Sequence, residues 1–440
     1  MKSSKLLAFL SFLLLFPASS LAVLKIDITQ GGSEPVRIAT PVFTGKDQAS
    51  ADLGAKITDV IDSNFNRSGL FTVISKTSYL QKIDGIETIP DFASWNGIRA
   101  QALLVGNIEI IGDNKVKVQF RLWDVPTGKQ TLAKSFTASA QGWRRISHLI
   151  SDEIYEYLTG EKGYFDTRIV YVAETGDWKH KTKRLAIMDQ DGANNMFLTS
   201  GNYLVLTPRF DPNMQRLIYL SYRTRVPSIH IYDLSSGREQ IVGKLPGMSF
   251  APRFSNDGSK AVFSISIEGN SDVYVMDLSS RRVKKITANP AIDTSPSFSP
   301  DDSRIVFNSD RDGSPQIYTM DADGGNVKRI SFGKGKYSTP VWSPRGDLVA
   351  FTKQLGGKFY IGVMKPDGGG ERLLTESYLD EGPTWSPNGR VIIFSRTTPS
   401  SSTVPGKSAL YSVDITGYNL RKIDTPTEAS DPAWSPLLSK

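Results

Sequence analysis

The sequence contains no cysteine among its 440 residues. The chain therefore has no disulfide bond, no thiol nucleophile and no zinc site of the cysteine type. A packed hydrophobic core must stabilise the fold without covalent help. Hydrophobic residues make up 39% of the chain and charged residues 22%, which is the balance of an ordinary globular protein with enough apolar material for such a core.

Histidine is also scarce, and the chain has only His148, His180 and His230. No two of them are close in sequence and none belongs to an H-E-x-x-H motif, so they are not expected to bind a metal. His148 lies in a predicted helix, and we expect it to cap this helix or lie on its surface. The motifs G-x-S-x-G, G-x-x-x-x-G-K-[ST] and G-x-G-x-x-G are missing as well. We therefore predict no catalytic residue, no metal site and no cofactor.

Long apolar runs are missing after the N-terminus, and residues 1–22 have the features of a signal peptide. Lys2 and Lys5 give a positive start, residues 6–16 are apolar, and small residues lead to Ala22. The apolar run is too short to span a bilayer comfortably. We predict cleavage after Ala22 and an exported, soluble chain that is peripheral to a membrane at most.

Positive charge is modest and shows no clustering. The net charge is +7, and removal of Lys2 and Lys5 leaves +5. No basic cluster alternates with aromatic residues, and an exported protein rarely meets nucleic acid. We therefore expect no nucleic-acid partner.

A repeated segment dominates the chain after residue 208, with "PSFSPDDSRIVF" at residues 296–307 as one copy. The repeat prolines are separated by 44, 44, 44, 43 and 49 residues, and they are Pro208, Pro252, Pro296, Pro340, Pro383 and Pro432. Each period contains β-branched and aromatic runs divided by Gly, Asp and Pro, without helical periodicity. Several short strands every ~45 residues are typical of propeller blades.

The two ends of the repeat array predict the number of blades. Six copies of the repeat begin with a Pro-x-aromatic strand, and each is expected to continue with a second strand of the type "xYxMD". One strand of this second type, in "RLAIMDQDG" at residues 184–192, comes before the first copy. The last copy, which begins at Pro432, has no such strand after it. We therefore predict that residues 161–440 form a six-bladed β-propeller that the C-terminal strand closes against residues 167–201.

Residues 23–160 predict a small α/β domain. Strands are expected over residues 36–43 and in "FTVI", and a helix between them has Leu53, Ile57 and Ile61 on one face. "ALLVGNIEIIGDNKVKVQFRLWDVPTGKQ" predicts three strands with tight turns, and "ISHLISDEIYEYL" predicts a second helix. Residues 159–165 are the expected linker.

Two sets of repeated residues suggest chemistry but suit structural roles. Aspartates recur after the second strand of most repeats and are expected to form turns, since a complete calcium loop is missing. One aromatic residue per repeat could stack on a sugar, but recurrence in every blade favours packing between blades. The segments before the repeat prolines vary most, and a binding site is expected there.

Several segments resemble a known family. They are "SGLFTVI", "LLVGNIEI", "VQFRLWDVPTGK" and "HLISDEIYEYLTGEKGYFDTRIVYV" in the first domain, and "NSDVYVMDLSS", "SYLDEGPTWSPNG" and "DPAWSP" in the repeats. In this order they resemble the TolB family of the Tol-Pal system over essentially the whole mature chain. The resemblance implies a periplasmic, non-catalytic adaptor that supports outer-membrane integrity and constriction during cell division. It also implies two partners: the peptidoglycan-associated lipoprotein Pal, bound at the propeller mouth, and TolA, contacted by a freed N-terminal arm.

The resemblance also implies contact residues. Transferred by motif, the mouth contacts fall in the loops before three repeat prolines, on Met248, Ala251, Thr294, Ser295, Asp380 and Glu381. Met248 and Ser295 depart from the family pattern, in which a histidine and an acidic residue can stand. The arm corresponds to residues 23–32, in which Leu24, Ile26 and Ile28 alternate. Such a segment could add as a strand to a partner's sheet or form an edge strand of its own domain.

The competing function is a propeller that binds glycans or acts on polysaccharides. It would need exposed aromatic and charged groups on one face, a pattern that the sequence leaves open. A peptidase propeller would need some two hundred further residues with a nucleophile elbow, which the first domain does not contain.

Overall fold

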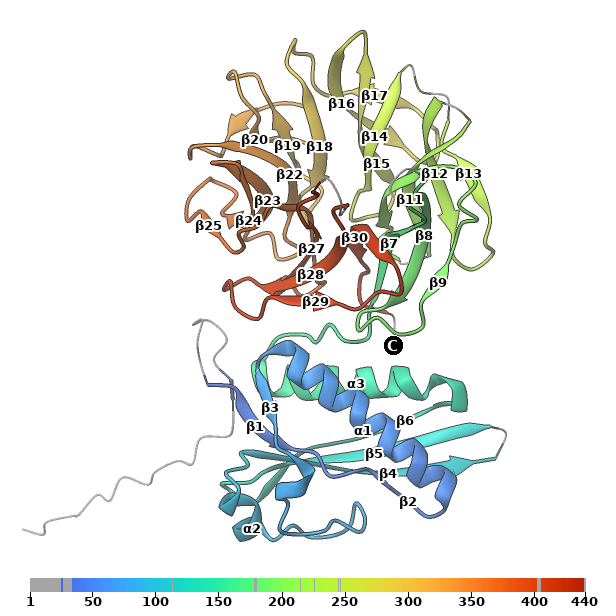
Figure 1. Cartoon of the computed structure of the whole chain (residues 1–440), viewed down its shortest axis with the longest axis vertical. Coiled ribbons are helices and arrows are strands. Elements are labelled where there is room, and N and C mark those ends of the chain that lie inside the picture. Colours follow the sequence, from blue (N-terminus) through green and yellow to red (C-terminus); the bar gives the residue numbers. More distant parts are fainter. Residues whose placement is uncertain are drawn as a thin grey trace, which may run out of the picture.

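A computed structural model of the chain describes residues 25–26, 34–112, 114–177, 180–213, 215–224, 226–243, 245, 247–401 and 405–438. The predicted signal peptide and the arm residues Leu24 and Ile28 lie outside these residues. The described chain forms a small α/β domain beside a six-bladed β-propeller, which confirms the predicted fold class (Figure 1). Among the described residues, no helix combines the length and apolar character that a bilayer crossing requires.

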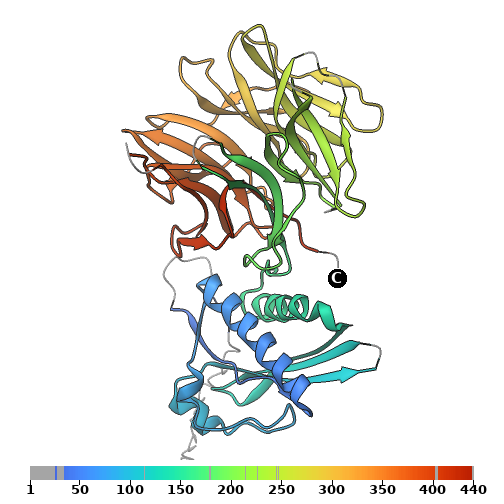
Figure 2. The same cartoon turned by 45° about the vertical axis from the view of Figure 1, so that its right-hand side comes forward.

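The α/β domain is a twisted sheet with two helices on one face. Its elements are β1 (Val36–Ala39), β2 (Thr44–Gly45), α1 (Gln48–Ser68), β3 (Phe71–Val73), α2 (Phe92–Gly97), β4 (Ala102–Ile111), β5 (Lys115–Asp124), β6 (Lys129–Ser139) and α3 (Trp143–Thr159). The sheet order is β3-β1-β4-β5-β6, with β2 beside β4. β1 runs parallel to β3 and β4, whereas β4, β5 and β6 form the predicted antiparallel meander. The helices α1 and α3 lie between this sheet and the propeller (Figures 1 and 2).

Local sequence explains the limits and the buried face of α1. The Asp47 side chain accepts a hydrogen bond from the Ser50 amide at 2.8 Å, which caps the first turn. Gly69 ends the helix in a left-handed conformation with φ of 73°, which glycine adopts without the usual steric cost. Ile57 and Ile61 are fully buried, as the helical spacing of apolar residues predicts.

Each propeller blade is a four-stranded antiparallel sheet. From the innermost strand outward, the first blade contains β10 (Val205–Phe210), β11 (Arg216–Thr224), β12 (Val226–Asp233) and β13 (Glu239–Ile241), and the second contains β14 (Met248–Phe254), β15 (Lys260–Ile267), β16 (Asn270–Asp277) and β17 (Val283–Lys285). The third contains β18 (Asp293–Phe298), β19 (Arg304–Ser309), β20 (Gln316–Asp321) and β21 (Lys328–Arg329), and the fourth contains β22 (Lys336–Trp342), β23 (Val349–Leu355), β24 (Lys358–Met364) and β25 (Arg372–Leu373). The fifth contains β26 (Leu379–Trp385), β27 (Val391–Thr397), β28 (Ser408–Asp414) and β29 (Arg421–Ile423), and the sixth contains β30 (Glu428–Trp434), β7 (Arg168–Thr175), β8 (Thr182–Asp189) and β9 (Met196–Phe197).

The C-terminal strand closes the ring as the repeat ends predict. β30 is the innermost strand of the sixth blade and pairs with β7, which begins the propeller more than 250 residues earlier in the chain. The Trp434 indole Nε1 donates to Thr167 Oγ1 at 2.8 Å, and the Ser435 amide donates to the Arg168 carbonyl at 2.8 Å. These contacts join the two ends of the propeller by non-covalent bonds alone.

Every innermost strand contains a β-bulge directly before its repeat proline. The pairing register with the next strand shifts at this point in all six blades. The residue before the proline has a φ between 46° and 66°, in the left-handed region, and these residues are Thr207, Ala251, Ser295, Thr339, Gly382 and Asp431. Only one of the six is glycine, so the fold holds five non-glycine residues in a conformation that they rarely adopt.

The two domains share one hydrophobic core. Its buried cluster extends from the sheet of the α/β domain through Tyr155 of α3 and Phe165 of the connection to Trp434 of β30. Tyr164 and Phe165 of the expected linker are 3% and 0% exposed. This connection is therefore packed between the domains, which fixes their relative position.

Candidate partner-binding site at the propeller channel

All six predicted mouth residues lie on innermost strands of the blades, which surround one central channel. They lie in three innermost strands: Met248 and Ala251 in β14, Thr294 and Ser295 in β18, and Asp380 and Glu381 in β26. The expectation that these residues stand in loops was wrong. The variable segment continues as a strand up to the bulge, because the ladder with the next strand begins before the proline.

One end of the channel carries exposed apolar side chains. At this end the innermost strands begin and the second strands finish, so that Met248 pairs with Ser266. The exposed fractions are 50% for Met248, 46% for Ile292, 53% for Tyr378, 38% for Ile267 and 37% for Leu355. We call these five residues the entrance rim. Apolar side chains gathered at the mouth of a rigid channel are typical of a protein-binding surface.

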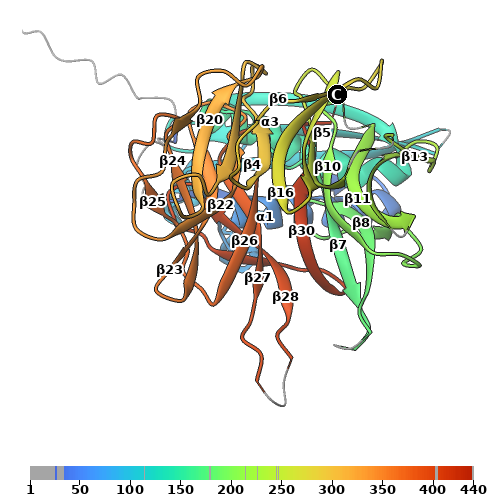
Figure 3. The same cartoon turned by 90° about the horizontal axis from the view of Figure 1, so that it is seen from above.

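The entrance rim faces away from the α/β domain. The contacts between the domains use the opposite end of the blades, where each innermost strand turns into the second strand. There the Asn388 side chain, between β26 and β27, donates to the Lys162 carbonyl at 2.9 Å. In Figure 3 the hairpin of β27 and β28, which belongs to the entrance end, extends away from the side on which α3 and β6 lie. A partner could therefore approach the rim without displacing the α/β domain.

Asp380 and Glu381 are neighbours in sequence but have different environments. Asp380 is completely buried, and both of its carboxylate oxygens accept hydrogen bonds from Arg396 at 2.7 Å, with a further bond from Thr375 Oγ1 at 2.6 Å. Its carboxylate therefore holds β26 and β27 together and is not accessible to a partner. Glu381 has an exposed side chain at the channel, as strand alternation requires.

Partial desolvation by the channel wall and, to a lesser degree, the Asp431 carboxylate on the neighbouring strand raise the pKa of Glu381. Of the acidic pair, Glu381 is thus the residue that a docked partner could meet.

The repeated aromatic residues lie at the other end of the channel. Five of them are only 5–8% exposed, namely Phe254, Phe298, Trp342, Trp385 and Trp434. They pack in clusters that join neighbouring blades, which confirms the structural interpretation. These five residues and Phe210 line a cavity of about 320 Å³ in the channel.

The described part of the arm is docked on the α/β domain. The Ile26 amide donates to the Leu158 carbonyl at 2.8 Å, and its side chain is 7% exposed within the main core cluster. The Lys25 ammonium lies 4.3 Å from the centre of the Tyr157 ring. Both contacts are to the last turn of α3, and neither residue belongs to a strand.

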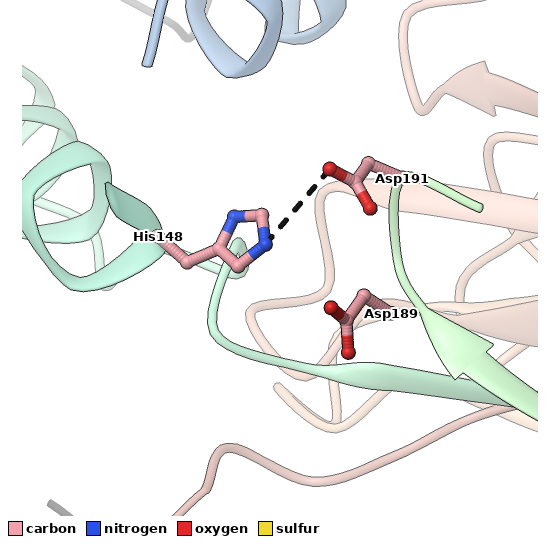
Figure 4. Close-up of side chains that lie close together, drawn as sticks. All are labelled: His148, Asp189 and Asp191. Carbon is pink, nitrogen blue, oxygen red and sulfur yellow. Dashed lines mark ion pairs between the residues drawn. The ribbon is translucent and has the colours of Figure 1, made fainter. Parts of the chain in front are cut away.

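His148 forms a buried polar cluster between the domains, so its predicted place at a cap or on the surface was wrong. Its ring is 3% exposed and points from α3 toward Asp191, which follows β8 in the propeller (Figure 4). The nearest ligand atoms of His148, Asp189 and Asp191 lie within 4.8 Å of one another. Burial lowers the pKa of His148 to about 4, so the ring is neutral at neutral pH.

Hydrogen bonds across the domain interface fix the tautomer of this ring. Arg67 can only donate, and it donates to Gln190 Oε1 at 3.1 Å. The Gln190 amide nitrogen then donates to Asn64 Oδ1 at 3.1 Å, and the Asn64 amide nitrogen donates to His148 Nδ1 at 3.0 Å. A neutral His148 therefore carries its proton on Nε2, which faces the Asp191 carboxylate at 3.9 Å.

This tautomer does not suit a metal site. A protonated Nε2 offers no lone pair to a cation. Arg144 also contacts both carboxylates, with a hydrogen bond to Asp191 Oδ2 and a separation of 3.7 Å from Asp189 Oδ2. The cluster is better described as an electrostatic contact that joins α3 to the propeller.

These observations define a class of protein: a six-bladed propeller that is rigidly joined to a small α/β domain and carries an apolar rim around its channel. Comparison with known families gives two matches, to the TolB beta propeller domain over residues 155–438 and to the TolB amino-terminal domain over residues 24–131. The chain is 56% identical to the Tol-Pal system protein TolB of Pelagibacter ubique over 436 residues, which cover 97% of this chain and 98% of that protein.

Solved structures agree with this result. The crystal structure of TolB from Acinetobacter baumannii superposes with a TM-score of 0.82 at 29% identity, and the match covers 94% of this chain and all of that one. Hydrazine synthase from Kuenenia stuttgartiensis matches 63% of this chain and 48% of its own at 13% identity and a TM-score of 0.51, which shows a shared fold alone. The chain belongs to the TolB family of the Tol-Pal system.

Proposed function

We propose that this protein is a non-catalytic periplasmic adaptor, which binds the lipoprotein Pal through the entrance rim and TolA through its N-terminal arm. In this role it supports outer-membrane integrity and invagination during cell division. Membership of the TolB family supports the proposal, since the relative with 56% identity is a Tol-Pal system protein. The predicted signal peptide over residues 1–22 supports the periplasmic location.

The observation that carries the proposal is the exposed apolar rim around the channel entrance. Met248 is about half exposed on a rigid strand, so it can be buried by a partner with little loss of backbone freedom. Thr294 and Glu381 lie on the same channel and add polar contacts to an apolar centre. This arrangement has the composition of a protein interface, in which a few buried anchors supply most of the affinity.

The arm suits a second, separate contact. In the docked state Ile26 is held by one backbone hydrogen bond and one buried side chain. Lys25 and Ile26, the described residues of the arm, contact the last turn of α3, and a partner would replace these contacts when it frees the arm. We propose that the freed arm, with Leu24, Ile26 and Ile28, binds TolA.

A pull-down from envelope extract tests both contacts. One bait is the mature chain from residue 23, and the second bait lacks residues 23–32. Recovery of Pal by both baits, with loss of TolA from the shortened bait alone, is the expected result. Failure of the full-length bait to retain Pal would reject the adaptor function, and retention of TolA by the shortened bait would reject the role of the arm.

A further inference from the structure

A second cavity, of about 640 Å³, lies between the two domains. The end of α1 and strand β3 form one wall, and the turn between β28 and β29 in the fifth blade forms the other (Figures 1 and 2). The Asn419 side chain of this turn donates to the Arg67 carbonyl of α1 at 2.8 Å, which holds the two walls together. The lining residues include neither the entrance rim nor the described arm residues Lys25 and Ile26.

Tyr418 brings an exposed aromatic ring to the lining of this cavity. The residue is 63% exposed, and its side chain has no hydrogen bond or ring contact within the part of the chain that the structure describes. The turn itself does not require the ring. Its backbone bond, from the Asp414 amide to the Tyr418 carbonyl at 3.0 Å, recurs in the third and fourth blades with Gly325 and Gly369 in place of the tyrosine. The fifth blade therefore presents an aromatic ring that its fold can do without.

Three polar side chains that line the cavity keep free hydrogen-bonding capacity, and they come from both domains. Arg421 uses only its Nε, which donates to Asn419 Oδ1 at 2.5 Å, so both Nη groups lack a partner among the described residues. Asn66 uses only its Oδ1, which accepts from the Val73 amide at 3.4 Å, and its amide nitrogen lacks a partner in the same part of the chain. The Thr72 hydroxyl is exposed and forms no hydrogen bond to any described residue. A polar ligand could bind to all three groups.

The charge of the lining favours an acidic ligand. Two arginines, Arg390 and Arg421, line the cavity with one carboxylate, that of Asp414. Arg390 Nε donates to Asp414 Oδ2 at 2.6 Å, and Asp414 Oδ1 accepts from the amide and the hydroxyl of Thr416 at 2.8 and 2.6 Å. Both oxygens of Asp414 are thus occupied, whereas Arg421 forms no ion pair with a described residue. An external carboxylate would give Arg421 a partner of opposite charge.

We propose that the cavity between the domains binds an acidic saccharide, a sugar unit that carries a carboxylate. The Tyr418 ring stacks on the sugar ring, because the face of an aromatic ring carries partial negative charge and suits C–H groups. Arg421 binds the carboxylate through two parallel N–H donors. Asn66 and Thr72 bind sugar hydroxyls. The volume of about 640 Å³ lies within the usual range of small-ligand pockets.

Two sources can supply such a sugar: the muramic acid units of peptidoglycan and a polysaccharide of uronic acids. Titrations of the mature protein, followed by saturation-transfer-difference NMR, use a matched pair of probes for each source. N-acetylmuramic acid is compared with neutral N-acetylglucosamine, and glucuronic acid is compared with neutral glucose. We expect saturable binding of at least one acid, with at least tenfold weaker binding of its neutral analogue, and the acid that binds more tightly identifies the source. Binding of neither acid, or equal binding of acid and neutral analogue in both pairs, would overturn the proposal.

Variants with the same probes place the site in this cavity. Tyr418→Ala should weaken binding of the acid at least tenfold, and Arg421→Gln should reduce it to the level of the neutral analogue. Both side chains are exposed, so the melting temperature should stay unchanged. Arg372→Gln is the matched control, because Arg372 is exposed at the equivalent position of β25 in the fourth blade and should leave binding unchanged.

Wild-type affinity in both cavity variants, or an equal loss in the Arg372→Gln control, would overturn the assignment to this cavity. The assay contains neither Pal nor TolA. Its result therefore stands apart from the adaptor function proposed above.

Discussion

Replacement of His148 by glutamine should remove a large part of the protein's sensitivity to mild acid. His148 is buried between α3 and the propeller, where Asn64 donates to its Nδ1 and the charged groups Arg67, Arg144 and Asp191 surround it. Burial lowers its pKa from the ordinary 6.5 to about 4. Between these two values the unfolded chain binds a proton at this site and the folded chain does not, so stability falls as pH falls.

The size of the effect follows from the two pKa values. A difference of one pKa unit corresponds to about 1.4 kcal/mol, so the unfolded state gains about 2 kcal/mol between about pH 7.5 and about pH 5. Over this interval the folded state gains almost nothing, because its own pKa lies lower still. The wild type should therefore lose about 2 kcal/mol more of its unfolding free energy than His148→Gln does.

Urea unfolding at both pH values measures this difference, and an NMR titration of the histidine rings measures the pKa directly. His180→Gln is the matched control, because the His180 side chain is 82% exposed. The unfolding free energy of this variant should depend on pH in the same way as that of the wild type. Equal pH dependence in His148→Gln and wild type, or a His148 titration midpoint near its ordinary value, would refute the buried, neutral state.

Three further predictions concern the propeller. Asp380→Asn should lower the unfolding free energy by about 3 kcal/mol in urea titrations, since it leaves the Arg396 guanidinium partly buried without its carboxylate, and a loss below about 1 kcal/mol would show that the pair is not structural. Gly382→Ala should lower the unfolding free energy by about 1 kcal/mol, because an added Cβ meets no atom within 4 Å and only the left-handed φ of 66° opposes it. Ala251→Gly should leave the unfolding free energy unchanged or raise it, because it relieves the same backbone strain. The reverse order of the two effects would contradict the strain at the bulge. Deletion of residues 428–440 removes β30 and should abolish the cooperative thermal transition of the propeller in calorimetry, while an unchanged transition would show that closure is dispensable.

The repeat sequence predicts the blades because every blade uses the same positions for the same purpose. The incomplete repeat before Pro208 and the incomplete repeat that begins at Pro432 together imply that the last strand closes the ring. In the structure β30 pairs with β7 in this way. The α/β domain was predicted from its helical spacing and turn residues. The parallel pairing of β1 with β3 and β4 has no local signal, because it depends on contacts between distant segments.

The site was harder to predict than the fold. Asp380 and Glu381 are alike in chemistry and adjacent in sequence, and only the register of β26 decides that one is buried and the other exposed. His148 was misplaced because Asp191, which its Nε2 faces, and Gln190, which orients Asn64 beside the ring, belong to the other domain.

The most direct test of the adaptor function is a calorimetric titration of the mature protein with the soluble domain of Pal from the same organism. We predict saturable one-to-one binding that Met248→Glu with Ile292→Glu weakens at least tenfold. Both residues are about half exposed, so the double variant should fold, and Met196→Glu, on the outer strand β9 with 56% exposure, should bind like the wild type. Absence of binding by the wild type, or equal affinity of the rim variant and the control, would contradict the proposed role of the entrance rim.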